Sequence, residues 1–301
     1  RRDGANAHVL FDSIRGVTKA LESSNNGAEK TNDPAIGSFN PDGFTVTGSS
    51  NQTNASSGSY VGWAWKAGGT AGTNTDGSIT SLVSASSEYG FSVVSYTGNG
   101  TAGATVGHGL NSSPSLILLK TRGDTQNWMV YHSALGATKA VFLSTTDSAA
   151  TSSVYFSNTE PTSSVFSLGT RAGINQNSDP MIAFCFSAVE GYSAFGKFSG
   201  NSSTDGPFQY CAFKPRFLLL KGITQARDWI ILDTERDAGN VGDSYLHPNT
   251  SGAESTYAIA DILSNGFKMR YSGGLANQTG EEYVWAAFAE HPFSLNGGLA
   301  R

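Results

Sequence analysis

The sequence predicts an all-β protein made of tandem repeated β-sandwich, or barrel-like, domains of about 100 residues. Three observations carry this prediction. The composition suits strands and turns, the chain repeats itself over a long distance, and its apolar runs are short and separated by turn residues.

The composition is poor in charge and rich in turn residues. Charged residues make up 14% of the chain, against about 25% in an ordinary globular protein. Gly, Ser, Thr and Asn fill the deficit, and such residues favour turns between short strands. With 11% aromatic residues and a net charge of −5, the chain does not resemble a disordered protein, which needs few apolar residues and a high net charge.

The charge balance and the apolar runs also bear on the partners. The chain carries 24 acidic and 19 basic residues, whereas a nucleic-acid-binding protein usually has a basic excess. The sequence contains no run of about 18 apolar residues that would predict a membrane-spanning helix. Neither binding to nucleic acid nor membrane insertion is expected.

The strongest signal is an internal repeat. Residues 114–120 and 215–221 share the pattern Pro-x-apolar-apolar-apolar-apolar-Lys and lie 101 positions apart. The tryptophan-led runs 128–132 and 229–233 keep this spacing, and the apolar runs 181–186 and 283–288 lie 102 positions apart. A register held within one residue over such a length predicts two copies of one domain.

A third copy, which lacks its front, opens the chain. Residues 8–12 take the place of 128–132, residues 42–44 that of 265–267, and residues 60–65 that of the closing apolar strand. Counterparts of 91–120 would lie before Arg1, so we expect the gene product to extend upstream, with a Pro-apolar-Lys strand just before Arg1. The predicted domains are an incomplete first β repeat (1–66), a Gly/Ser/Thr-rich linker (67–90), a second repeat (91–190) and a third repeat with a C-terminal tail (191–301).

Each unit is expected to contain about seven short strands. In the second copy they are 91–96, 105–110, 116–120, 128–131, 140–143, 165–168 and 181–186. No long segment shows the 3.6-residue period of an amphipathic helix. Only residues 16–24 could hold a short helix.

The histidines, carboxylates and cysteines suggest no site for chemistry. His8 and Asp12 have the look of an acid–base pair, but in the later copies their places are taken by Trp128 and His132, then by Trp229 and Asp233. A position that accepts either His or Trp is typical of packing. Cys185 and Cys211 are flanked by aromatic residues, and the five tryptophans lie in repeated strand positions, so both sets are predicted to pack in the cores.

One loop has the density of oxygen ligands that calcium prefers. Asp233, Glu235, Asp237, Asn240 and Asp243 lie within eleven residues. The sixth position of the loop is Ala rather than Gly, and the twelfth is Ser rather than Glu, so it departs from a calcium loop. We interpret it as a polar loop with an internal arginine–carboxylate pair. No catalytic, cofactor-binding or metal-binding residue is therefore predicted, and neither a cofactor nor enzymatic activity is expected.

The third copy carries a recognisable signature. It reads WIILDTER at 229–236, LSNGFKMR at 263–270 and YVWAAFAEHPF at 283–293, after GYSAFGKFSGNSSTDGPF at 191–208. These segments resemble the uncharacterised β-rich repeat domain of tail-fibre-like and other virion proteins of marine tailed phages. The resemblance covers nearly the whole chain, and it implies no catalytic residues.

This resemblance and the repeat lead to a functional hypothesis. The chain is expected to be a non-enzymatic structural protein of a phage virion surface, such as a tail fibre, a spike or a capsid decoration, that serves assembly or host attachment. Its expected partners are other virion proteins or copies of itself in a homo-oligomer such as a trimer, together with a host surface glycan. The alternative is a lectin-like carbohydrate-binding module of a secreted or cell-surface protein. A polysaccharide depolymerase would need a carboxylate groove, which no motif indicates.

Overall fold

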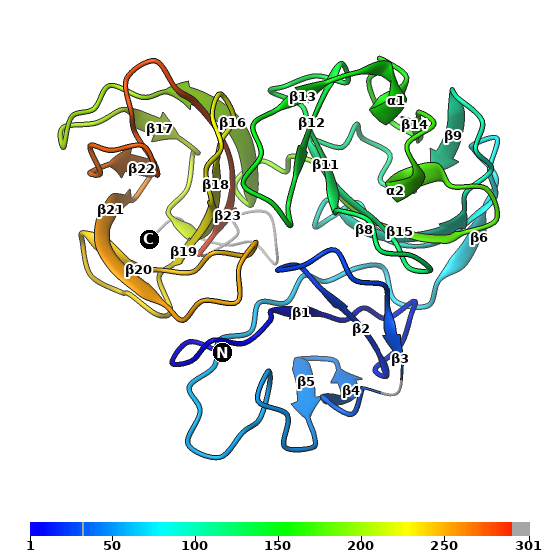
Figure 1. Cartoon of the computed structure of the whole chain (residues 1–301), viewed down its shortest axis with the longest axis horizontal. Coiled ribbons are helices and arrows are strands. Elements are labelled where there is room, and N and C mark those ends of the chain that lie inside the picture. Colours follow the sequence, from blue (N-terminus) through cyan, green and yellow to red (C-terminus); the bar gives the residue numbers. More distant parts are fainter. Residues whose placement is uncertain (32, 291–301) are drawn as a thin grey trace. The chain divides into compact units, whose positions relative to one another are not determined.

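A computed structural model describes residues 1–31 and 33–290, and in these residues it confirms the all-β prediction (Figure 1). Strands make up nearly all of the regular structure, and the two helices have only four residues each. None of the helices in this part of the chain has the length and apolar character needed to cross a bilayer. The predicted C-terminal tail lies outside the described residues.

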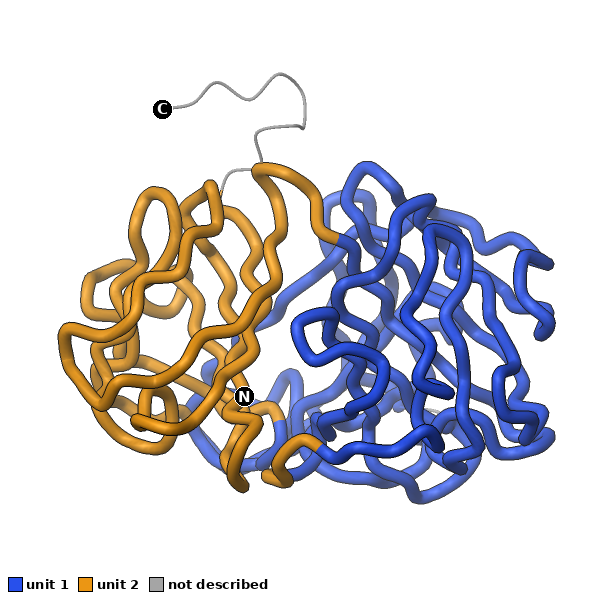
Figure 2. The backbone as a smooth tube through the Cα atoms, turned by 90° about the horizontal axis from the view of Figure 1, so that it is seen from above, with its two compact units in different colours: residues 1–145, 150–187, 249–253 blue, residues 146–149, 188–248, 254–301 orange. Residues whose placement is uncertain are grey.

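The chain divides into two compact units (Figure 2). Unit 1 consists of residues 1–145, 150–187 and 249–253, and unit 2 of residues 146–149, 188–248 and 254–301. The change of unit at residue 188 lies close to the boundary predicted between the second and third repeats. The first and second repeats, in contrast, are not separate units, because both belong to unit 1.

An eight-stranded antiparallel sheet forms the framework of unit 1. In spatial order its strands are β13 (Ala150–Thr151), β12 (Lys139–Phe142), β11 (Met129–His132), β10 (Leu116–Thr121), β15 (Pro180–Phe186), β8 (Phe91–Thr97), β7 (Ser81–Ser86) and β6 (Gly72–Asn74). A second, two-stranded sheet pairs β9 (Ala104–Gly107) with β14 (Val165–Leu168). The helix α1 (Ser153–Phe156) contacts β14, and α2 (Ala172–Asn175) contacts β10. Apolar residues of both sheets and both helices share one core. All seven strands predicted for the second repeat are present.

The segment 67–90 differs from the predicted linker, because it supplies β6 and β7 to this sheet. Along β7 the side chains of Ser81 and Val83 are buried, while Leu82 between them is exposed, which is the alternation of a strand. The buried hydroxyl of Ser81 donates to the carbonyl oxygen of Gly107 at 2.9 Å. The serines of β7 therefore interrupt the apolar pattern that would predict a strand, although their hydroxyls are hydrogen-bonded inside the fold.

The first repeat forms β1 (Val9–Leu10), β2 (Lys19–Glu22) and β3 (Lys30–Thr31) in one sheet, and β4 (Ile36–Asn40) with β5 (Gly43–Val46) in a hairpin. Two predictions fail here. The short helix at 16–24 is replaced by β2, because residues 19–22 pair with both β1 and β3 and bury Ala20 and Leu21. Gly16, at the start of the predicted helix, has a φ of 88°, which is outside the helical region. The closing strand at 60–65 is not formed; no strand of the first repeat lies beside it to complete a ladder.

Unit 2 is a sandwich of two four-stranded antiparallel sheets. One contains β16 (Ser193–Ser199), β23 (Glu282–Ala289), β18 (Pro215–Gly222) and β19 (Trp229–Asp233). The other contains β17 (Phe208–Tyr210), β22 (Gly266–Met269), β21 (Ser255–Leu263) and β20 (Gly242–Tyr245). Apolar side chains from both sheets meet in one core. The ladder β11–β10–β15 of unit 1 has its counterpart in β19–β18–β23, as the sequence offset of 101–102 predicts.

Candidate functional site

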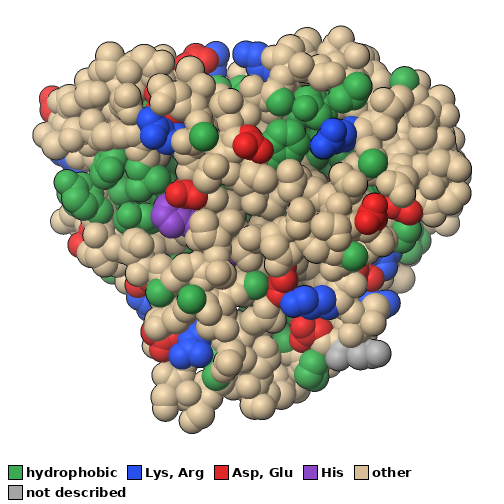
Figure 3. All heavy atoms as spheres, in the orientation of Figure 1, with side chains coloured by type: hydrophobic (Ala, Val, Ile, Leu, Met, Phe, Trp, Pro, Cys, Tyr) green, Lys and Arg blue, Asp and Glu red, His purple; other side chains and the backbone are tan. Residues whose placement is uncertain are grey.

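Three tyrosines and a histidine gather on the sheet that holds β20, β21 and β22 in unit 2, and we call them the tyrosine cluster. Tyr257 and Tyr271 meet edge to face, with ring centroids 5.1 Å apart. Tyr245 meets His247 in the same way, with centroids 5.2 Å apart. Figure 3 shows a group of hydrophobic side chains over this part of the sheet, beside a histidine.

In the tyrosine cluster, two rings pack against the core and the third projects into solvent. Tyr245 and Tyr271 pack against the core of unit 2, whereas Tyr257 on β21 is 59% exposed. Burial raises the pKa of Tyr245, and the nearby Tyr271 and Asp228 raise it further. The Tyr245 phenol thus stays protonated at neutral pH and can both donate and accept hydrogen bonds.

His247 is held by the main chain. Its Nδ1 lies 2.7 Å from the carbonyl oxygen of Trp229. Because a carbonyl can only accept, Nδ1 carries the proton in this contact. This hydrogen bond fixes the orientation of the imidazole beside Tyr245.

A second exposed aromatic pair, which we call the β17 strip, lies on the edge strand of the same sheet. Phe208 is 43% exposed and Tyr210 66% exposed, while Gln209 between them turns inward and accepts a hydrogen bond from Trp285 Nε1 at 3.2 Å. Tyr210 pairs with Gly266 of β22. A Cβ atom on Gly266 would lie 2.0 Å from the carbonyl oxygen of Gln209, so only glycine fits at this position opposite Tyr210.

Charged residues form a network next to the β17 strip. Lys268, which pairs with Phe208 across the ladder, binds the carboxylate of Asp205. Arg270 Nε donates to Asp261 at 2.6 Å. The hydrogen bond from Lys268 holds the pKa of Asp205 below its usual value. The strip is therefore an apolar surface bordered by ionised groups.

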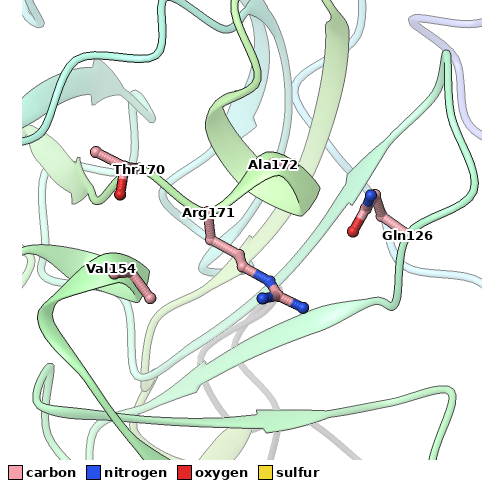
Figure 4. A pocket seen from close by; sticks show the side chains of 5 residues that line it. All are labelled: Gln126, Val154, Thr170, Arg171 and Ala172. Carbon is pink, nitrogen blue, oxygen red and sulfur yellow. The ribbon is translucent and has the colours of Figure 1, made fainter.

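A separate hollow of about 450 Å³ lies in unit 1 (Figure 4). Its lining consists of Gln126, Val154, Thr170, Arg171 and Ala172. The Arg171 side chain projects into it from the start of α2. The lining offers hydrogen-bond donors and one positive charge, but it contains no carboxylate, histidine or cysteine that could act as a general base or nucleophile.

The residues weighed as an acid–base pair have structural roles. Asp12 accepts hydrogen bonds from the main chain of Ile14 and Arg15 and from the Arg15 guanidinium. Arg15 also binds Glu29, with Nη1 3.2 Å from Oε2. Asp12 is therefore engaged in a buried ion pair with Arg15.

The loop weighed as a calcium site uses its oxygens internally. Asp233 is bound by Arg236 Nε at 2.6 Å, as the sequence predicts. Asp237 accepts from the main-chain N–H groups of Asp243 and Ser244, and Asn240 exchanges two hydrogen bonds with the main chain of Ile262. No group of three or more His, Cys, Asp or Glu side chains that could hold a metal occurs in residues 1–31 and 33–290.

The predicted core residues are partly as expected. Trp128, Trp229 and Trp285 are buried, and Trp63 and Trp65 are half-buried. Both cysteines are buried, and burial raises the pKa of each thiol to about 12. Sequence reasoning missed Tyr257 and the β17 strip. The one available signal was Gln209, a polar residue between two aromatic ones in a strand.

No curated protein matches the chain, and no solved structure matches it. One family does, and it is described as a domain of unknown function. The match covers residues 1–292, which include both compact units nearly to their ends. The chain therefore belongs to the family named Domain of unknown function (DUF7483).

Proposed function

We propose that the chain is a non-enzymatic structural protein of a tailed-bacteriophage virion surface, and that it attaches the particle to its host through the tyrosine cluster. The observation that carries the proposal is the aromatic cluster on one sheet of a protein with few charges, with half-buried Tyr245, His247 and Tyr271 around the exposed Tyr257. Contiguous exposed apolar side chains mark interaction surfaces on soluble proteins. On this proposal the chain is a tail fibre, a spike or a capsid decoration.

Two features of the whole chain support this proposal. Equivalent strand ladders recur along the chain, as in proteins that present the same domain several times. The segments at 229–236, 263–270 and 283–293 resemble β-rich repeat domains of phage virion proteins. On this proposal the chain lies at the virion surface, with other virion proteins or further copies of itself, for instance in a trimer, as partners.

The alternative is a lectin-like module of a secreted or cell-surface protein, and the tyrosine cluster favours it as well. The face of a pyranose ring that bears C–H groups can stack on an aromatic ring, and phenol hydroxyls can bond the sugar hydroxyls. The two proposals share a host surface glycan as ligand. They differ in whether the chain is part of a particle.

Mass spectrometry of purified phage particles distinguishes them. If the first proposal holds, the chain is present in stoichiometric copies in particles banded by density, and protease treatment of intact particles cleaves it. Its absence from particles of a phage whose genome encodes it would contradict the first proposal and leave the lectin alternative.

Glycan binding tests the cluster itself. We expect Tyr257→Ala to weaken binding to an immobilised host polysaccharide by about 30-fold, the effect of removing a central interface residue worth about 2 kcal/mol. The matched control is Tyr210→Ala, an equally exposed tyrosine in the β17 strip. Equal binding by the wild type and Tyr257→Ala would reject the cluster, and a loss confined to Tyr210→Ala would move the site to the strip.

A further inference from the structure

The hollow of unit 1 contains three polar side chains that the fold leaves unused (Figure 4). Gln126, Thr170 and Arg171 line it, and within residues 1–31 and 33–290 none of these three side chains makes a hydrogen bond or an ion pair. Thr170 and Arg171 are exposed, and Gln126 is half-buried. The guanidinium and its two neutral neighbours are therefore available to a ligand.

The main chain of Arg171 is held in place, although its side chain has no partner in the described part of the chain. Its N–H donates to the carbonyl oxygen of Val154 in α1 at 2.9 Å. Its own carbonyl oxygen accepts from the N–H groups of Ile174 and Asn175, both at 3.0 Å. The side chain thus projects from a fixed point, and a preorganised site loses less conformational entropy when it binds.

The three repeats share this turn, but only the second places an arginine in it. In each repeat the N–H of an asparagine donates to the carbonyl oxygen four residues earlier. The pairs are Asn54 with Ser50 at 2.8 Å, Asn175 with Arg171 at 3.0 Å and Asn277 with Gly273 at 3.0 Å. The turn therefore forms with serine, arginine or glycine at this position, so the fold does not require the arginine.

The opposite side of the hollow is also particular to the second repeat. The helix α1 brings Val154 into the lining, and among the described residues the first and third repeats contain no helix. The Val154 side chain is 37% exposed, so it contributes little to the core. Both sides of the hollow are thus features that the repeated fold can do without.

The lining has the chemistry that an acidic sugar needs. A guanidinium presents its N–H groups in a planar fork that matches a carboxylate. The Gln126 amide and the Thr170 hydroxyl can each donate and accept, as sugar hydroxyls require, and Val154 offers an apolar contact to C–H groups. The volume of about 450 Å³ is that of a small-molecule site, and no carboxylate in the lining repels an anion.

We propose that this hollow binds a uronic-acid residue, with Arg171 on the carboxylate and with Gln126 and Thr170 on the sugar hydroxyls. The inference rests on the proposed function in one respect, because that function makes a glycan the ligand. The site itself lies in unit 1, whereas the tyrosine cluster lies in unit 2, so the two can be tested separately.

Isothermal titration calorimetry of the full chain with tri-galacturonic acid tests the proposal. We expect the acid to bind at least about tenfold more tightly than its methyl ester, because esterification removes the charge-assisted hydrogen bonds to Arg171. Arg171→Met should weaken binding of the acid to the same extent. Arg171→Lys should weaken it in part, since lysine keeps the charge but not the planar fork.

The matched control is Arg216→Met, which removes another exposed guanidinium and should leave binding of the acid unchanged. Equal binding of acid and ester, or of wild type and Arg171→Met, overturns the proposal. An equal loss in Arg216→Met overturns it as well, because binding would then follow the overall charge. Thermal unfolding verifies that each variant is folded.

Two further probes test the chemical class of the ligand. One is a sulfated oligosaccharide without carboxylates, and the other is trialanine, which carries a carboxylate but no sugar. We expect both to bind more weakly than tri-galacturonic acid. Tighter binding of either would overturn the assignment to a uronic acid.

Hydrogen–deuterium exchange with saturating tri-galacturonic acid locates the bound ligand. Exchange should slow at 153–156 and 169–175 and stay unchanged at 255–271. Slowing at 255–271 alone would place the acid at the tyrosine cluster, which overturns this inference and leaves the proposed function intact. Binding at 153–156 and 169–175 together with no effect of Tyr257→Ala on the host polysaccharide would support this site and contradict the tyrosine cluster.

Discussion

Arg15 and Arg236 stand at corresponding positions of two repeats, and each forms a buried ion pair with carboxylates. The groups around each pair decide how much it contributes to the free energy of unfolding. Arg236 Nε donates to Asp233, Nη1 binds Glu254, and Nη2 donates to the carbonyl oxygen of Ile231. Its side chain is almost completely inaccessible, as is that of Arg15 in the first repeat. Removing one partner of such a pair leaves a buried charge without compensation.

We therefore expect Arg236→Met to lower the free energy of unfolding by about 3–5 kcal/mol, since Asp233 and Glu254 would face each other without the guanidinium. The matched control is Arg216→Met, which breaks the exposed ion pair with Glu235 and should cost at most about 1 kcal/mol. Urea unfolding of both variants measures the difference. Similar costs for the two would show that the buried position contributes nothing special.

Glu29 makes stability depend on pH on the acid side. Burial alone would raise its pKa, but hydrogen bonds and charge from Arg122 and Arg15 outweigh burial and hold the pKa below its ordinary value of 4.5. The folded state therefore binds the proton less readily than the unfolded chain does. The stability that Glu29 contributes is present above pH 4.5 and is lost as the pH falls through the lowered pKa.

Glu29→Gln checks this dependence. At pH 7 the variant should be less stable than the wild type, because it loses the charge-assisted pairing with Arg122 at 2.8 and 2.9 Å. Toward pH 3 the difference in the free energy of unfolding should shrink, as the wild-type carboxylate becomes protonated. A difference that stays constant from pH 7 to pH 3 would contradict the assignment.

At the scale of elements, a buried asparagine connects two loops of a repeat. One is the turn after the first strand, and the other is the segment that precedes the last strand. Asn175 Oδ1 accepts from the N–H groups of Asn99 and Gly100, and Nδ2 donates to the carbonyl oxygens of Thr101 and Gly169. Asn277 makes the equivalent contacts in unit 2. The side chain thus replaces main-chain partners that two loops would otherwise lack.

Because the removal of this amide would leave several buried main-chain groups without a partner, Asn175→Ala should cost about 3 kcal/mol. Asn177→Ala, two residues away and exposed, should change stability by less than about 0.5 kcal/mol. Thermal unfolding monitored by near-UV circular dichroism measures both. Equal transition temperatures for the two variants would show that the hydrogen bonds of the Asn175 side chain do not stabilise the fold.

The accuracy of the sequence reasoning varies from element to element for physical reasons. Short apolar runs between turn residues predicted β8, β10, β11 and β15 almost to the residue, because such a run is contained within one segment of the chain. Residues 60–65 have the composition of a strand, yet a strand needs a neighbour to pair with, and composition does not supply one. At β7 the serines concealed the alternation, because their hydroxyls are satisfied by main-chain carbonyls only in the folded state.

At the scale of the whole molecule, the charge balance predicts how the protein meets polyanions. With 24 acidic against 19 basic residues and an isoelectric point near 5.5, the protein should release few counterions on contact with DNA. We expect no binding to double-stranded DNA at 150 mM salt by fluorescence anisotropy. Binding that weakens steeply with added salt would reveal a basic surface and contradict the proposed function.

The candidate site could not be predicted from the sequence, because its residues come together only in the folded molecule. Tyr245, Tyr257 and Tyr271 are spread over 27 residues, and no spacing rule links them. They meet because β20, β21 and β22 are neighbours in one sheet, and because Tyr245 and Tyr271 pack against the core of unit 2 while Tyr257 stays exposed. A pattern within one strand cannot report which strand will lie beside it.

The sequence by itself determined the all-β class, the positions of most strands, the equivalence of residues about 100 positions apart and the packing roles of the buried tryptophans. These follow from local periodicity and from self-similarity, which need no knowledge of contacts. The tertiary structure decided that 67–90 completes a sheet, that 60–65 forms no strand, and that three distant tyrosines lie close together. Each of these depends on long-range pairing, because a main-chain donor or an aromatic ring acquires its role only from the neighbour that the fold brings to it.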